Sequence, residues 1–271
     1  MQVKARKQPI PFYFGCSDRR LFGCFHEPSE KGVRRCAVLI CQPFGHEYIN
    51  SHRALRQLAA GLADAGFPVL RFDYYACGDS SGEPEQGSIT RWLEDISTAV
   101  AELRARAGMF QVCVVGLRLG ATLAAFSGSW RETFESIVLW EPVARGKTYL
   151  KETVSLHEEM LRFRPSPKRS KRSQAYTEVL GFPLSRFLHA QLEELDLAKA
   201  AERPANRVLI VQNVRADDDK ALKKHLVQTR AEVEHQTLQA PEIWLPTPDG
   251  SLLVPAQVLQ SLISWVSGVS L

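Results

Sequence analysis

The sequence predicts an α/β protein in which helices cover both faces of a mostly parallel sheet. Short, nearly continuous apolar runs such as 36–41 are typical of strands that are buried on both faces. Between them lie longer segments, such as 52–65, whose apolar residues recur at helical spacing. This alternation of strands and helices is the pattern of a parallel sheet. With 271 residues, 45% of them hydrophobic and 24% charged, the chain can bury a substantial core as a single domain over 1–271.

The order of elements begins with a predicted hairpin over 10–27, around a polar turn at 17–20. Further strands are predicted at 36–41, 67–73, 136–141, 207–212 and 233–238. Helices are predicted at 52–65, 89–107, 220–230 and 255–266. Residues 111–125 form a strand, a tight glycine turn and a helix in one continuous segment. The alternation is interrupted at 146–200, where two or three helical segments surround a basic stretch at 162–172, which is expected to be a mobile, solvated loop.

The tight turn contains the most informative residue, Arg118. Gly116 and Gly120 flank it and allow the backbone to turn sharply, so the side chain between them is expected at the top of the sheet. Arginine stays protonated at any working pH and cannot act as a nucleophile. Its planar donor fork suits a carboxylate or a phosphate. Arg118 could instead form an internal ion pair, and Glu141, at the end of the next strand, is the expected acidic partner.

The order of the elements resembles the α/β-hydrolase fold over nearly the whole chain. Residues 41–47 and 72–82 look like bacterial serine-aminopeptidase-like hydrolases, including those associated with exosortase or specialised-metabolite gene clusters. In this family a serine stands at the centre of the turn as the nucleophile, which is the position of Arg118 here. The resemblance also implies that 146–200 is a helical cap inserted into the domain.

The same resemblance implies a catalytic triad that this chain does not complete. The histidine is expected between the last strand and the final helix, but 239–254 contains none. The loop after 207–212 keeps an acidic candidate in Asp217. With the nucleophile and the histidine both absent, ordinary Ser-His-Asp hydrolysis is not expected.

Several binding residues are expected around the turn. The backbone N–H groups of Phe44, Gly45 and Leu119 match the donors that bind an oxyanion in such hydrolases, although the fold itself could also require these turns. His46 and Glu47 are expected at the rim of the cleft. His46 could be a general base or could only fix its loop. Tyr74 or Tyr75 could donate a hydrogen bond to a substrate.

Two functional hypotheses remain. In the first, the protein is a pseudoenzyme that binds a peptide, acyl or carboxylate-bearing intermediate of a bacterial biosynthetic pathway in the cleft under the cap. In the second, Arg118, His46 and Glu141 catalyse a cyclisation, an elimination or an atypical hydrolysis. No cofactor is expected, and no metal, because the six cysteines lack metal-ligand spacing. The expected location is cytoplasmic.

Composition restricts the partners further. No apolar run approaches the ~20 residues of a membrane span. The net charge of +4 is too small to indicate nucleic acid. A homodimer remains open.

Overall fold

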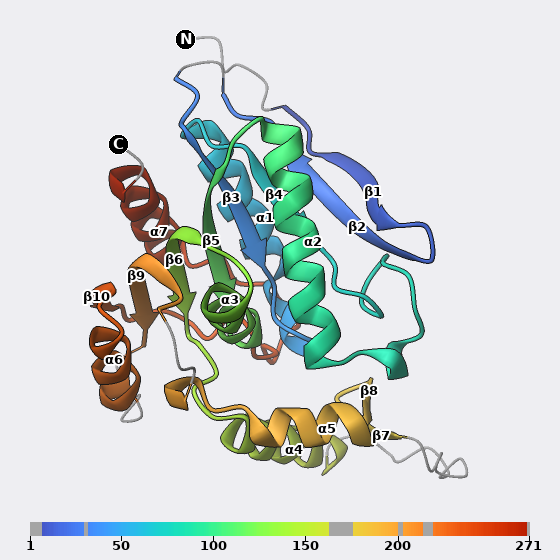
Figure 1. The fold of residues 1–271 in the computed structure, drawn as a ribbon. Coiled ribbons are helices and arrows are strands. Elements are labelled where there is room, and N and C mark those ends of the chain that lie inside the picture. The colour runs from blue at the N-terminus through green and yellow to red at the C-terminus, as the bar shows by residue number, and fades with distance from the viewer. Residues whose placement is uncertain (1–6, 30–31, 163–175, 200–202, 214–218, 270–271) are drawn as a thin grey trace.

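The computed structural model describes residues 7–29, 32–162, 176–199, 203–213 and 219–269. Its main feature is an eight-stranded sheet in the order β1-β2-β4-β3-β5-β6-β9-β10 (Figure 1). The strands are β1 (Ile10–Cys16), β2 (Arg19–His26), β3 (Cys36–Cys41), β4 (Val69–Phe72), β5 (Gln111–Leu117), β6 (Phe134–Trp140), β9 (Ala205–Gln212) and β10 (Glu232–Thr237). Only β1–β2 and β2–β4 pair antiparallel in this sheet. The predicted fold class, a mostly parallel central sheet with helices, is confirmed.

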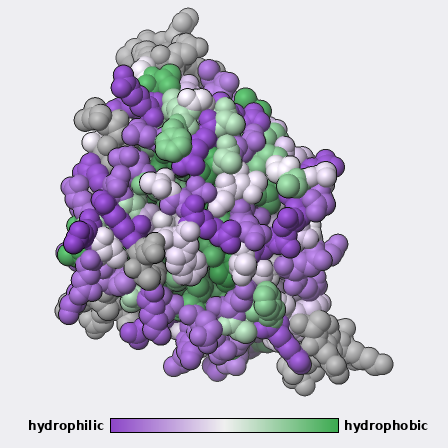
Figure 2. Space-filling model, viewed as in Figure 1, coloured by the Kyte–Doolittle hydropathy of each residue, from purple (hydrophilic) through white to green (hydrophobic). Residues whose placement is uncertain are grey.

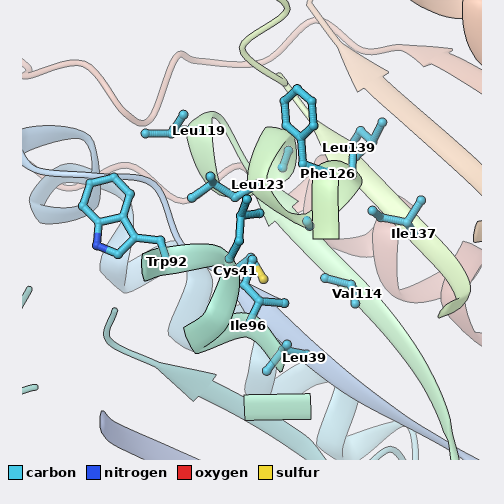
Figure 3. Packing of buried hydrophobic residues seen from close by; sticks show 14 of the residues in the cluster. Leu39, Cys41, Trp92, Ile96, Val114, Leu119, Leu123, Phe126, Ile137 and Leu139 are labelled. Atoms are coloured by element: carbon cyan, nitrogen blue, oxygen red, sulfur yellow. The ribbon is translucent and has the colours of Figure 1, made fainter. Parts of the chain in front are cut away.

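Helices cover both faces of this sheet. Alternate residues of β3 belong to two separate hydrophobic clusters, because successive side chains of a strand point to opposite faces. Leu39 and Cys41 pack with α2 (Ile89–Ala107) and α3 (Leu119–Trp130), as Figure 3 shows. Val38 and Ile40 pack in the cluster that contains α1 (His46–Asp64) and α7 (Ala256–Val269). Two shorter helices are η1 (Pro84–Gln86) and α6 (Asp219–Gln228), and α6 packs against β10.

The first helix begins earlier than its apolar periodicity predicts. It begins at His46 and not at 52, because Gly45, at φ +63°, turns the chain into the helix directly after β3. No side chain caps this helix end. The early start places His46 and Glu47 in the first helical turn, so the backbone there is fixed by the helix.

The segment between β6 and β9 contains α4 (Gly146–Arg162), β7 (Tyr176–Val179), β8 (Phe182–Ser185), α5 (Arg186–Glu194) and η2 (Leu197–Lys199). We call residues 146–199 the cap segment. Its two helices lie together at the lower end of the sheet in Figure 1, beside an antiparallel β7–β8 hairpin. In addition to the helical segments that were expected here, the cap segment contains two four-residue strands, which pair across a turn at Leu180 and Gly181, both with positive φ. The predicted mobile loop lies almost entirely outside the described residues.

The surface in the view of Figure 1 is largely hydrophilic, with apolar side chains showing between the polar ones (Figure 2). In the part of the chain that the structure describes, no helix has both the length and the hydrophobicity to cross a bilayer.

Candidate functional site

The site is built around the sharp turn between β5 and α3. Arg118 occupies the apex with φ +53° and ψ −124°, a left-handed φ that non-glycine residues rarely adopt. A Cβ on Gly116 would collide with the backbone of Ala121, and one on Gly120 would collide with the carbonyl of Cys41. Both glycines are thus required by close backbone packing, and together they hold Arg118 at the apex.

Arg118 is tied to a buried carboxylate of the same chain. Its Nε donates a hydrogen bond to Oε1 of Glu47 at 2.8 Å, and the two side chains are only 14% and 2% exposed. Tyr149 of α4 donates through its hydroxyl to the second oxygen of Glu47, at 3.5 Å. On the outer side, Nη2 of Arg118 lies 3.6 Å from Oε2 of Glu152, also on α4. The guanidinium therefore connects the turn to α1 and to the cap segment.

Two aromatic rings lie against the same guanidinium. The carbon Cζ of Arg118 is 5.0 Å from the ring centroid of Trp244 and 5.8 Å from that of Tyr149. These distances are within the range of cation–π attraction. Trp244 belongs to the connection between β10 and α7, the region in which the resemblance to hydrolases led us to expect a histidine. His235, in the last strand, has its Nε2 3.2 Å from Oε1 of Gln212.

The expected pairing of Arg118 with Glu141 is wrong. Glu47 takes this role because the early start of α1 brings its carboxylate under the guanidinium. Glu141 follows β6 with φ +47°, and its Oε1 accepts a hydrogen bond from the backbone N–H of Asn213 at 2.6 Å. Arg118 and Glu141 nevertheless line the same cleft.

The charges at the turn follow from this burial. Burial raises the pKa of Glu47, and the attraction of Arg118 offsets this only in part. Burial also disfavours the charged form of Arg118, but the carboxylate of Glu47 more than compensates, so the pKa of Arg118 is raised and it remains a cation. Burial, and secondly the charge of Arg118, lower the pKa of His46 to about 4. His46 is therefore neutral near pH 7 and a weak base.

A cleft of about 930 Å³ lies between α4 and the carboxyl ends of the parallel strands. This edge of an open α/β sheet is where ligands bind. The predicted residues His46, Glu47, Arg118 and Glu141 all line it. Its wall on α4 includes Thr148, Lys151, Glu152, Ser155, Leu156 and Glu159.

Phe44 and Gly45 lie beside a separate apolar pocket. This pocket measures about 20 Å³, roughly the space of one water molecule. The ring of Phe44 contacts Trp92 at 5.0 Å between centroids and Phe182 of the cap segment at 6.2 Å. The side chain of Leu119 is buried, while its backbone N–H is in the first turn of α3, where helix amides lack intrahelical acceptors.

One of the predicted binding residues lies in the hydrophobic core and not at the cleft. Tyr74 is part of the hydrophobic core, with its ring 4.9 Å from Phe72 and 5.8 Å from Trp92 between centroids. Its side chain points to the α2 side of the sheet, so the expectation that it donates to a ligand is wrong. Asp217 lies outside the described residues.

Three residues of the site were missed by sequence reasoning: Tyr149, Glu152 and Trp244. Tyr149 and Glu152 are three positions apart on α4, and therefore on neighbouring positions of one helix face. That spacing and the aromatic residue in the loop expected to hold a histidine were visible in the sequence.

The comparisons with known proteins agree with this architecture. No protein-family model matches the chain, and no curated protein matches it. Among solved structures, an esterase from Butyrivibrio proteoclasticus with bound ferulic acid superposes with a TM-score of 0.67 at 15% identity, covering 95% of this chain and 96% of the esterase. An esterase from Pyrococcus furiosus gives a TM-score of 0.66 at 15% identity, covering 97% of this chain and 89% of that one.

A third structure carries the name of the fold. It is a lidless α/β serine hydrolase from Xanthomonas campestris, with a TM-score of 0.58 at 13% identity, and the match covers 98% of this chain and 94% of the hydrolase. This chain has the α/β-hydrolase fold. At such low identity the likeness concerns the fold, and within the α/β-hydrolase fold the chemistry depends on the residues at the turn and in the cleft.

Proposed function

We propose that this α/β-hydrolase-fold protein binds a ligand in its cleft without forming a covalent acyl intermediate. The observation that carries the proposal is the Arg118–Glu47 pair. It fills the position of the nucleophile with a permanent cation whose Nε already donates to a carboxylate of the chain. The ligand is a peptide or acyl intermediate of a bacterial biosynthetic pathway.

The contact between Arg118 and Trp244 supports the same proposal. A hydrolase of this fold needs a histidine to take the proton of its nucleophile. In this chain an indole lies against the guanidinium instead, in the loop that would hold that histidine. Because both positions are changed and contact one another, restoring one of them would not restore the catalytic pair.

The backbone at the turn supports retention of ligand binding. The N–H of Leu119, in the first turn of α3, is a donor of the kind that binds an oxyanion or carbonyl. The open cleft of about 930 Å³ next to it is within the size range of ligand-binding pockets.

The alternative, catalysis by Arg118, His46 and Glu141, has less support. A general base is most effective when its pKa is near the working pH, whereas the pKa of His46 is about 4. Glu141 already accepts a short hydrogen bond from the backbone of Asn213. Arg118 is engaged with Glu47 and Glu152.

The test compares the wild type with Arg118→Ser and the double variant Arg118→Ser/Trp244→His. Each is treated with a fluorophosphonate probe and with p-nitrophenyl acetate. We expect no covalent labelling and no esterase activity above background for the wild type, and no efficient esterase from Arg118→Ser alone. Stoichiometric labelling of the wild type, together with turnover that the probe abolishes, would contradict the proposal.

A further inference from the structure

The cleft has the opposite charge from the chain as a whole. The chain has a formal net charge of +4. The described residues that line the cleft, in contrast, include five carboxylates and two cationic side chains, Arg118 and Lys151. The carboxylates are those of Glu47, Glu141, Glu152, Glu159 and Glu242. The negative charge of the cleft therefore results from where these residues lie and not from the overall composition of the chain.

The pairing of Arg118 does not remove this negative charge. Arg118 and Glu47 neutralise one another in the buried pair. Among the other described residues that line the cleft, Lys151 is cationic and Glu152, Glu159 and Glu242 are acidic, as is Glu141, which already accepts from the backbone of Asn213. His46 adds no positive charge near pH 7, since burial and Arg118 keep its pKa at about 4. An anionic ligand would thus meet an unfavourable field, and the guanidinium that was expected to hold it already lies beside two carboxylates of the chain.

The acidic side chains come from both walls of the cleft. Glu152 and Glu159 are on α4 of the cap segment, Glu141 follows β6, and Glu242 is in the connection between β10 and α7. A ligand lying between the walls would have carboxylates on more than one side. Leu156, Trp244 and Leu245 provide apolar surface in the same cleft. Low-dielectric walls with one sign of charge concentrate counter-ions between them.

We infer that the ligand of this cleft is an organic cation, with an ammonium or guanidinium group attached to an apolar part. This inference rests on the proposed ligand-binding function and names the chemical class of that ligand. It replaces the sequence-based expectation of a carboxylate-bearing ligand. Within the peptide ligands of the proposal, it selects those with a basic side chain or a free amino group.

The test uses three probes of matched size that differ in charge: 4-phenylbutylamine, 4-phenylbutanol and 4-phenylbutyrate. Binding is measured by calorimetry and by the indole N–H signal of Trp244 in NMR spectra, at low and high salt. We expect the amine to bind most tightly, the alcohol less tightly and the carboxylate least. The advantage of the amine should shrink at high salt, because screening weakens interactions between exposed charges.

The matched variants locate the effect. Glu159→Gln combined with Glu242→Gln should weaken amine binding by about threefold to tenfold, since each exposed charge contributes little by itself. The control is Glu158→Gln, which removes the neighbouring exposed carboxylate on α4 that does not line the cleft, and it should leave affinity unchanged. Binding of the alcohol should be the same in all variants.

The inference is overturned if 4-phenylbutyrate binds as tightly as the amine, if the amine shows no saturable binding, or if the double variant binds the amine like the wild type. The proposed function fails in a different way, through covalent labelling and turnover. A protein that turns over esters yet prefers the amine would refute the proposed function alone.

Discussion

Arg118 and Glu47 form a buried ion pair, with Nε and Oε1 2.8 Å apart, between the apex of the β5–α3 turn and the first turn of α1. Two elements that are 71 positions apart in sequence are thus joined at the centre of the cleft. Breaking such a pair from one side leaves an uncompensated charge in the interior. The first two predictions follow from this relationship.

Replacement of Arg118 by methionine is expected to lower the free energy of unfolding by about 3 kcal/mol, the lower end of the usual range, because Glu47 can take up a proton when its partner is lost. Urea denaturation at neutral pH measures the change. The double variant Arg118→Met/Glu47→Gln should recover much of the loss. The control Glu152→Gln removes the 61% exposed partner and should change stability by less than about 1 kcal/mol. A fully stable Arg118→Met protein would contradict this prediction.

The stability deficit of Arg118→Met is expected to depend on pH. Burial already raises the pKa of Glu47, and the substitution removes the main influence that lowers it. The folded state then binds a proton that the unfolded state has released, so stability falls as pH rises through the window above the unfolded pKa. The deficit relative to the wild type should therefore grow as pH rises above the pKa that Glu47 has in the unfolded chain. Denaturation curves at several pH values test this, and Arg118→Met/Glu47→Gln should lack the trend.

His46 is expected to titrate with a pKa of about 4, well below the ordinary value of 6.5. Between these values the unfolded chain binds a proton that folded His46 does not, so its contribution to stability is lost as pH falls through this window. NMR titration of the ring signals, assigned by comparison with His46→Gln, gives the value. Because the charge of Arg118 is the second cause that lowers this pKa, Arg118→Met should raise the pKa of His46. A midpoint near 6.5 in the wild type would refute the burial argument.

Gly120→Ala is expected to destabilise the protein by about 1–3 kcal/mol or more, because the added methyl group would collide with the backbone carbonyls of Cys41 and Gln42. The matched control is Gly268→Ala in α7, where a Cβ meets nothing within 4 Å. It should be neutral or slightly stabilising, since alanine favours helix over glycine. Thermal melts of both variants provide the comparison, and equal melting temperatures would show that the turn tolerates a side chain at 120.

The sheet could be predicted from sequence because buried strand positions are occupied by apolar residues. All six residues of β3 are buried, which leaves a continuous apolar run. The turn at Arg118 was visible in part for a similar reason: Gly116 is required by the backbone of Ala121, five residues later, although Gly120 is required by Cys41 of the distant strand β3. Such local or strictly periodic requirements leave a signal in a single sequence.

The partner of Arg118 could not be predicted, since the start of α1 leaves little signal. Gly45 provides no capping side chain, and the first buried positions of the helix, Glu47 and Ser51, are polar, so an apolar pattern begins only at Ala54. Without that start, Glu47 seemed to belong to a loop. The prediction for Tyr74 was wrong for another reason. A side chain at a strand end can point to the cleft or to the core, and the sequence alone does not decide between them.

The left-handed φ of Arg118 has a consequence for how this protein can change during evolution. The conformation is held by Gly116 and Gly120, through backbone contacts that do not involve the side chain at the apex. Residue 118 can therefore be substituted without a change in the backbone of the turn, provided that Glu47 and Trp244 are substituted with it. Loss of either glycine would close that route, because every later side chain would be presented on a different backbone. The geometry of the turn is thus independent of the chemistry of the side chain that it presents.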